Sequence, residues 1–227
     1  MRVILFGGTG MVGEGVLHEA LKSPAVESVL VIGRRPCEVT HQKLQELLIS
    51  DFFDYTAVLD RLRGYNACFF CLGVTSIGKS EQEYRHLTYD LTMAAAAALS
   101  QLNPEMIFCY ISGAGTDSTE QGRSMWARVK GKTENDLMKL PFKAVYAFRP
   151  GFIKPIPGLK RTLAFARVLG PLYPVFRLLF PKLVCTLEEL GNSMIRVVEN
   201  GHSSRVLECE DIVRLAHAGS VSQTSEH

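Results

Sequence analysis

The residues with the clearest chemical potential form a glycine-rich segment near the start of the chain. It runs Phe6-Gly-Gly-Thr-Gly-Met-Val-Gly13, with glycines spaced G-x-x-G-x-x-G. An apolar run precedes it and an amphipathic segment follows it, so it is predicted to join a strand to a helix. Backbone N–H groups and the helix dipole then favour a phosphate at this turn.

The three spaced glycines have separate expected roles. Gly7 permits a tight turn, Gly10 lets the backbone approach a pyrophosphate, and Gly13 lets the helix pack close to the strand. The plainer alternative is a glycine-rich turn without a ligand. The residues expected to hold the pyrophosphate of a dinucleotide are Gly7, Gly8, Thr9, Gly10, Met11, Val12 and Gly13.

Two arginines follow the next apolar run, in the sequence Val31-Ile-Gly-Arg-Arg-Pro36. An acidic residue at this place binds the ribose 2′-hydroxyl of NAD, whereas arginine accommodates the 2′-phosphate of NADP. Arg34 and Arg35 stand here without an acid, and the guanidinium fork of donors suits a phosphate. We therefore expect NADP(H) as cofactor in preference to NAD(H). The alternative is a solvated loop.

Strands and helices are predicted to alternate along the chain. Strands are expected at 2–6, 28–32, 44–50, 67–72, 106–111 and 143–148, and helices at 11–22, 55–62, 80–102, 124–140, 187–200 and 210–217. Nearly continuous apolar strands between helices imply an α/β fold with a Rossmann-like, doubly wound parallel sheet. We expect a dinucleotide-binding domain over 1–155, a small C-terminal helical extension covering the substrate over 156–218, and a flexible tail over 219–227.

Composition narrows the class of protein. The chain has 227 residues with a formal net charge of +2, and 47% of them are hydrophobic. This is typical of a soluble globular protein and excludes a disordered chain. Near-neutral charge without a recognition motif argues against nucleic-acid binding. The cysteines are sparse and no targeting segment is recognisable, so a reduced, cytoplasmic protein is expected.

The spacing of cysteines and histidines argues against a metal site. Cys68 and Cys71 form a C-x-x-C inside an apolar run. Residues three apart on a strand point to opposite faces, so the pair cannot easily share a metal or a disulfide. The histidines show no ligand spacing. We expect structural cysteines and no bound metal.

With these motifs, the chain resembles the extended or atypical form of the short-chain dehydrogenase/reductase superfamily. More closely, it is similar to NAD(P)-binding, epimerase-like bacterial proteins related to the Tat-interacting protein oxidoreductases. The resemblance covers residues 1–155 well and the remainder loosely. It implies an adenine contact after the third strand, cofactor contacts at the end of the fourth, and a Pro-Gly beside the nicotinamide after the sixth. The positions that match these contacts are Asp51, Phe52, Cys71, Leu72, Gly73, Pro150 and Phe152.

The catalytic signature of that superfamily, Tyr-x-x-x-Lys, stands here as Trp126-Ala-Arg-Val-Lys130. The resemblance implies that Lys130 binds the nicotinamide ribose and that Ser112, after the fifth strand, holds the substrate oxygen. An indole N–H donates a hydrogen bond but does not titrate near neutrality. Trp126 is therefore expected to shape the pocket rather than to act as a general acid.

Two replacements for the missing hydroxyl remain open. Water could supply the proton while Ser112 and Lys130 polarise a carbonyl. Alternatively, a hydroxyl could come from another element, the candidates being Tyr84, Tyr89, Tyr110 and Tyr146.

Two further segments bear on the substrate. The polar loop 116–119 either binds a polyol or sugar or is an ordinary turn. Residues 137–187 contain basic residues but no Asp or Glu, and their apolar part is expected to cover the substrate. This suggests an apolar or amphiphilic substrate with an anionic head group. Peripheral membrane contact through 158–182 is the less favoured alternative.

The leading functional prediction is an NADP(H)-binding oxidoreductase or epimerase-like enzyme. It would act on a small carbonyl or alcohol substrate, with hydride passing to or from the nicotinamide C4. The alternative is a non-catalytic NADP(H)-binding protein that reports redox state to a partner, and Trp126 favours it. Members of the superfamily often dimerise through helices, so a homodimer is a further alternative to a single chain.

Overall fold

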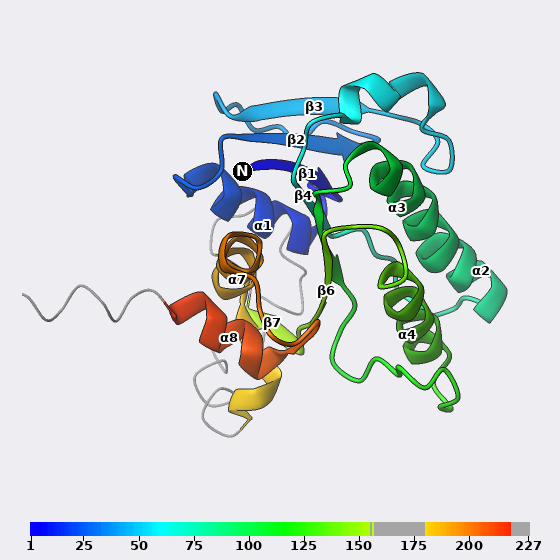
Figure 1. Ribbon diagram of the computed structural model, residues 1–227. Helices are drawn as coiled ribbons and strands as arrows, with labels where there is room; N and C mark the ends of the chain where they lie inside the picture. Colours follow the sequence, from blue (N-terminus) through cyan, green and yellow to red (C-terminus); the bar gives the residue numbers. More distant parts are fainter. Residues whose placement is uncertain (155, 157–179, 219–227) are drawn as a thin grey trace, which may run out of the picture.

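A parallel sheet with the strand order β3-β2-β1-β4-β5-β6-β9 runs through the molecule (Figure 1). The computed structural model describes residues 1–154, 156 and 180–218. The chain adds strands outward from β1 to β3 and then returns to β4 on the other side of β1, which defines the switch point of a doubly wound sheet. This confirms the predicted α/β, Rossmann-like fold. The strands are β1 (Arg2–Phe6), β2 (Ser28–Gly33), β3 (Leu44–Leu48), β4 (Ala67–Phe70), β5 (Ile107–Ile111), β6 (Ala144–Arg149) and β9 (Val206–Glu208).

Helices cover both faces of this sheet. One face carries α1 (Met11–Lys22), α7 (Leu187–Asn200) and α8 (Cys209–His217). The other face carries α4 (Met125–Leu137) and a long helical segment made of α2 (Glu81–Arg85), the π-helical turn η2 (His86–Asp90) and α3 (Leu91–Leu102). The 3-10 helix η1 (Thr56–Leu62) precedes β4. The predicted helix 80–102 is therefore helical from Glu81 to Leu102, with Ser80 as its N-cap, and one π turn interrupts its regular hydrogen bonding.

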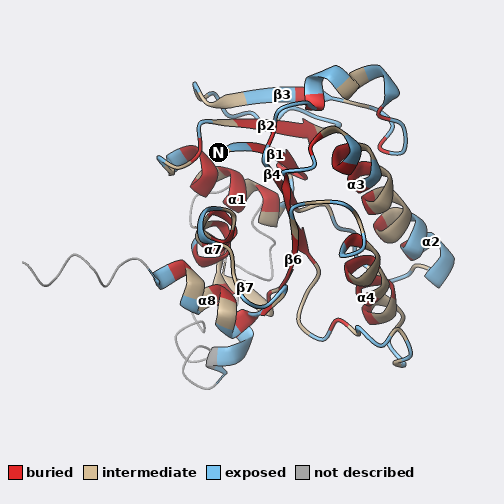
Figure 2. Ribbon diagram, in the orientation of Figure 1, coloured by how far each residue is buried: buried red, intermediate tan, exposed pale blue. Residues whose placement is uncertain are grey.

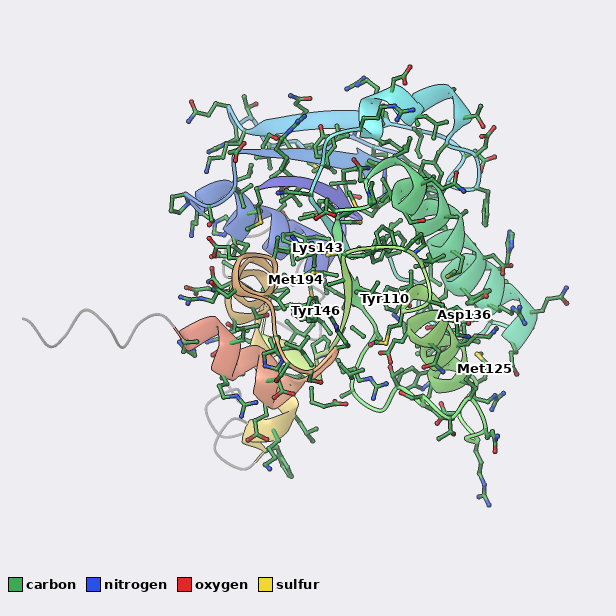
Figure 3. The ribbon with its side chains drawn as sticks, in the orientation of Figure 1. Tyr110, Met125, Asp136, Lys143, Tyr146 and Met194 are labelled. Carbon is green, nitrogen blue, oxygen red and sulfur yellow. The ribbon has the colours of Figure 1, made fainter. Side chains whose placement is uncertain are left out.

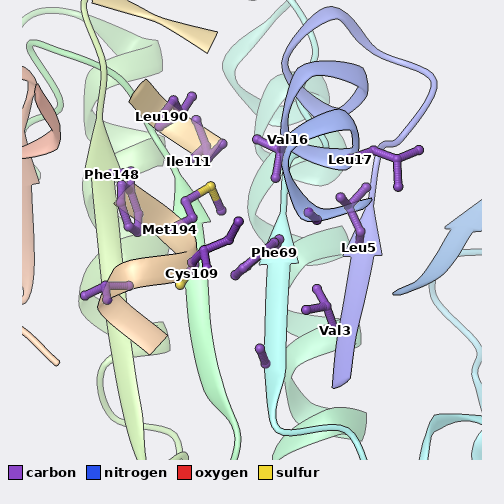
Figure 4. Close-up of a cluster of buried hydrophobic side chains, with 14 of the residues drawn as sticks. Val3, Leu5, Val16, Leu17, Phe69, Cys109, Ile111, Phe148, Leu190 and Met194 are labelled. Carbon is purple, nitrogen blue, oxygen red and sulfur yellow. The ribbon is translucent and has the colours of Figure 1, made fainter. Parts of the chain in front are cut away.

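Two hydrophobic cores fill the layers between the sheet and its helices (Figure 2). Figure 4 shows one of them, where side chains of β1, β4, β5 and β6 meet side chains of α1 and α7. The apolar strands contribute to both cores because successive side chains point to opposite faces. Cys68 lies in one core and Cys71 packs against the other, as the strand geometry predicts. All six cysteines are free.

Three short strands were not predicted. β7 (Phe152–Lys154) and β8 (Val184–Thr186) pair in parallel as a separate two-stranded sheet, and β9 pairs with β6. Strands of three residues are too short for an alternating pattern to identify them. A short 3-10 helix, η4 (Pro181–Leu183), precedes β8. Residues of the predicted C-terminal extension therefore complete the main sheet.

Much of the predicted substrate cover and the whole predicted tail lie outside the described residues, at 155, 157–179 and 219–227. Among the helices of the described part, none combines the length and the apolar character that a membrane span requires.

Candidate functional site

The glycine turn between β1 and α1 closes on its own backbone. The Gly10 N–H donates to the Gly7 carbonyl at 2.9 Å, and Gly7 has a φ of +82°, which favours glycine. A Cβ at Gly7 would lie 2.9 Å from the backbone of Cys71 and Leu72, just beyond β4. A Cβ at Gly13 would overlap the Gly7 carbonyl, whereas one at Gly10 would stay 3.4 Å from it. The fold therefore requires glycine at positions 7 and 13 and leaves space beside Gly10.

The start of α1 is open to an anion. Gly10 is the N-cap of this helix and offers no side chain to its first N–H groups. Such uncapped N–H groups and the positive end of the helix dipole favour negative charge. Thr9, Met11 and Val12 are half-buried in the same turn, and Gly8 is buried.

A cavity of about 240 Å³ opens beyond the carboxyl ends of β2, β3 and β4. Residues from all three strand ends and from the helical segment η2–α3 line it. Five of these residues were expected from the sequence: Arg34, Asp51, Phe52, Leu72 and Gly73. The others are Ser50, Phe53, Val74, Leu87 and Leu91. The fold thus brings half of the predicted cofactor contacts beyond the glycine turn into one cavity. The other five are not among its lining residues: Arg35, Cys71, Lys130, Pro150 and Phe152.

Of the two adjacent phenylalanines that line this cavity, Phe53 is more exposed than Phe52. Phe53 is exposed and stacks on His86, with ring centroids 4.6 Å apart and planes 6° from parallel. Phe52 is buried and its ring lies against Phe6 in the core. Asp51 accepts a hydrogen bond from the Phe53 N–H at 2.8 Å, which fixes this turn. Phe53 was not identified from the sequence, because its stacking depends on how the helical turn η2, which carries His86, packs against it.

The two arginines after β2 differ in position. Both are exposed, but Arg34 lines the cavity and Arg35 is not among its lining residues. Arg34 is therefore the better placed of the two for a phosphate next to the cavity.

The ends of β5 and β6 form a second border of the site. The Ser112 N–H and its Oγ both donate to the Phe148 carbonyl, at 2.9 and 3.1 Å. The Ala114 N–H donates to the Pro150 carbonyl at 2.9 Å. These bonds hold Ser112 beside the segment that leads into Phe152, which is half-buried at the start of β7.

Lys130 is buried on the side of α4 that faces β5. Its Nζ donates to the Ile111 carbonyl at 3.0 Å and lies 5.3 Å from the centre of the Tyr110 ring. Figure 3 labels Tyr110, which belongs to β5. Burial lowers the pKa of Lys130 to about 8, while the Glu134 carboxylate acts in the opposite direction. The ammonium is therefore largely charged at neutral pH, next to the residue that precedes Ser112.

Trp126 lies one turn before Lys130 on α4, and it is half-buried. A Cβ at Gly115 would sit 3.6 Å from the indole ring, so Trp126 faces the loop that follows β5. Gly115 has a φ of +86°, a backbone conformation that glycine adopts without strain.

The four tyrosines that could replace the missing hydroxyl have other environments. Tyr89 donates to Asp136 at 2.7 Å, and Tyr146 bonds to the backbone of His202. Tyr84 and Tyr110 are buried, and burial raises the pKa of both. None of the four combines an accessible hydroxyl with a place beside Ser112.

The polar residues 116–119 after β5 form hydrogen bonds mainly with other residues of the same loop. Asp117 accepts hydrogen bonds from the N–H and Oγ of Thr119 and from the Gly122 N–H, which lowers its pKa. The Thr116 Oγ donates to the Gly113 carbonyl at 2.7 Å. These are the contacts of turn residues. Across the described chain, no group of three or more His, Cys, Asp or Glu side chains could hold a metal ion.

Comparison with known proteins returns relatives of modest identity. No family model matches the chain. The leucinostatins biosynthesis cluster protein T of Purpureocillium lilacinum is 26% identical over 230 residues, which cover 84% of this chain and 82% of that protein. The mitochondrial FMP52 protein of Emericella nidulans is 29% identical over 158 residues, and that of Debaryomyces hansenii is 28% identical over 153 residues. Each of these two matches covers 66% of this chain and 66% of the relative.

These relatives correct two expectations from the sequence. They are fungal proteins and not the bacterial proteins related to Tat-interacting oxidoreductases. The predicted cytoplasmic location is wrong, since several relatives are named mitochondrial proteins. Composition and free cysteines could not have decided this point, because they do not distinguish one reducing compartment from another.

Solved structures share the fold over most of the chain. Gre2 of Candida albicans, in complex with NADPH, has a TM-score of 0.68 at 13% identity and covers 92% of this chain and 78% of that one. The dTDP-glucose 4,6-dehydratase DesIV of Streptomyces venezuelae, with NAD bound, has a TM-score of 0.67 at 14% identity and covers 96% and 80%. At such identities the likeness establishes the fold alone, a Rossmann fold seen in a dehydratase and in proteins with bound NAD or NADPH.

Proposed function

We propose that the protein binds NADP(H) and acts as an oxidoreductase or epimerase-like enzyme on a small carbonyl or alcohol substrate. The observation that carries the proposal is that the glycine turn and the cavity at the strand ends are neighbours: Leu72 lines the cavity, and its backbone N lies beside Gly7. The turn would hold the pyrophosphate, the cavity the adenosine, and Arg34 the 2′-phosphate. The bound NAD and NADPH in proteins of the same fold support a nicotinamide dinucleotide. The names of the fungal relatives favour mitochondria as the location.

The remaining site residues would act at the nicotinamide end. The dinucleotide supplies hydride at its nicotinamide C4 when it is bound. The Lys130 ammonium would hold the ribose hydroxyls, and Pro150 and Phe152 would border the ring. Ser112 would donate to the substrate oxygen after turning from the Phe148 carbonyl, to which it now donates. The Trp126 indole would donate to the substrate or stack on it, and water would supply the proton.

The alternative is an NADP(H)-binding protein without catalysis. It is favoured by Trp126 in place of a tyrosine and by the environments of the four candidate tyrosines, which are buried or already hydrogen-bonded. Oxidation of NADPH with a panel of aldehydes, ketones and quinones separates the two functions. Turnover that Lys130→Ala abolishes supports the enzyme, whereas firm NADPH binding without turnover on any compound supports the binding protein.

The first expected result is quenching of tryptophan fluorescence by NADPH. Trp126 is the only tryptophan in the chain. Its place on α4, one turn from Lys130, puts it near the proposed nicotinamide position, where energy transfer is efficient. Separate titrations with NADPH and NADH measure both affinities. If neither nucleotide binds, the proposed function is wrong.

The cofactor preference is expected to depend on Arg34. Arg34→Ala should weaken NADPH binding by about 1–3 kcal/mol and change NADH binding little, because a charge-assisted bond to the 2′-phosphate is lost. Arg35→Ala is the matched control, and we expect a smaller effect because Arg35 is not among the residues that line the cavity. Equal losses for both nucleotides in Arg34→Ala would contradict the assigned role.

Binding of NADPH is also expected to weaken as the pH rises through about 8. Lys130 carries its charge below its lowered pKa, about 8, and loses that charge above it. The neutral amine attracts the ribose hydroxyl oxygens less strongly. Dissociation constants measured on both sides of this pH test the expectation, with Lys130→Met as a control that removes this dependence. A wild-type affinity that is constant across this range would contradict it.

A further inference from the structure

A buried ion pair lies one helical turn from Lys130. Glu134 is 1% exposed and Arg149 is 11% exposed. The Glu134 carboxylate accepts from Arg149 Nε at 3.0 Å and also from Nη2. Lys130 and Glu134 are four residues apart on α4, so their side chains leave the helix on the same face. Glu134 therefore lies one turn further along the face of α4 that carries Lys130, and its carboxylate is bound there by Arg149.

Arg149 connects this carboxylate to three other parts of the fold, namely β6, β9 and the loop after β5. It is the last residue of β6, directly before Pro150. Its Nη1 donates to Glu208 on β9 at 3.2 Å, and its Nη2 donates to Ser118 Oγ at 2.5 Å in the loop after β5. One guanidinium therefore joins α4, which carries Lys130 and Trp126, to the strand that leads into Pro150.

The other titratable groups around Lys130 are either neutral tyrosines or carboxylates that bind other partners. β5 presents the Tyr110 ring, and α2 adds Tyr84, which interacts with Tyr110. α3 has no ionisable side chain. Across α4, Tyr89 of η2 bonds to Asp136. The Asp117 carboxylate of the neighbouring loop is turned toward Thr119 and Gly122. Among the described residues, Glu134 is the carboxylate whose interaction with Lys130 opposes the cost of burying it.

We propose that Glu134 is a positioning residue of the dinucleotide site, which keeps Lys130 in its charged form and is itself held in place by Arg149. The inference rests on the proposed function, because a charged Lys130 serves a nucleotide. Neutralising Glu134 removes the nearby negative charge, so Lys130 loses its proton at lower pH. Arg149 then contributes through Glu134, by fixing where the carboxylate lies.

The test measures the titration of Lys130 itself, without any nucleotide. Lysine labelled with ¹³C at Cε gives one resonance per residue, and the Lys130 resonance is identified by its loss in Lys130→Met. In the wild-type protein we expect a midpoint near 8. In Glu134→Gln we expect the midpoint to fall by about one pH unit. Glu208→Gln removes a different partner of the same Arg149, and we expect it to leave the midpoint unchanged.

A second variant covers the case in which Glu134→Gln does not fold. Glu134→Gln/Arg149→Met removes both charges at once and avoids an unpaired buried arginine. Its Lys130 midpoint is also expected to lie below the wild-type value. A wild-type midpoint in these Glu134 variants overturns the proposal. Failure of the wild-type protein to bind NADPH would instead count against the proposed function, while the Lys130 midpoints would still decide the role of Glu134.

Discussion

Replacing Arg149 by Met is expected to reduce the free energy of unfolding by about 3–5 kcal/mol. The substitution leaves the Glu134 carboxylate buried without the guanidinium that now contacts both of its oxygens. It also removes the bonds that join β6 to Glu208 and to Ser118. Urea denaturation followed by circular dichroism measures the loss, which should appear as a lower midpoint with an unchanged slope.

Two control variants test whether the loss comes from the buried, unpaired Glu134 carboxylate. Arg214→Met breaks an ion pair with Asp211 in which the arginine side chain is 66% exposed, so we expect a loss of at most about 1 kcal/mol. The double variant Glu134→Gln/Arg149→Met removes the unpaired charge and should recover most of the lost stability. A loss below about 1 kcal/mol in Arg149→Met alone would contradict the expectation, because it would show that leaving the Glu134 carboxylate without Arg149 costs little.

Replacing Gly13 by Ala is expected to weaken NADPH binding by about a hundredfold or more, equivalent to about 2.7 kcal/mol. The added Cβ overlaps the Gly7 carbonyl, which accepts the Gly10 N–H in the present turn. The turn must open or α1 must move away from β1, and either change displaces the N–H groups from the phosphate position. Fluorescence titration with NADPH measures the effect, and thermal unfolding should show lower stability as well.

Gly10→Ala separates binding from folding at the same turn. Its Cβ would stay 3.4 Å from the nearest atom, so we expect little change in thermal stability. The methyl group would still occupy the space in which the pyrophosphate approaches the backbone, and NADPH binding should weaken. Unchanged affinity in both glycine variants would mean that the turn holds no pyrophosphate.

The helices whose boundaries were predicted correctly are specified by short-range sequence features. α1 and α7 begin and end at the predicted residues, Met11–Lys22 and Leu187–Asn200. Thr186 and Glu189 form a capping box at the start of α7, which is a short-range feature that a sequence records. β9 was missed because its three residues form a strand through pairing with β6, more than fifty residues earlier in the chain.

The contrast between local signals and contacts of distant segments also explains which site residues could be predicted from the sequence. Residues at strand ends could be placed because parallel strands all deliver their carboxyl ends to one edge of the sheet. Phe53, Leu87 and Leu91 could not, since their approach depends on how the segment η2–α3 packs across that edge. The pair formed by Glu134 and Arg149 joins two elements that no motif connects.

The late position of β9 in the chain has a consequence for the order of folding. The β6 edge of the sheet stays without its neighbour until residues 206–208 have left the ribosome, and α1 lacks its contacts with α7 almost as long. An unpaired strand edge is a site where chains associate wrongly. The β6 edge is therefore open to wrong pairing from the synthesis of Arg149 until residues 206–208 emerge and pair with it, and we expect nascent chains to associate mainly in that interval.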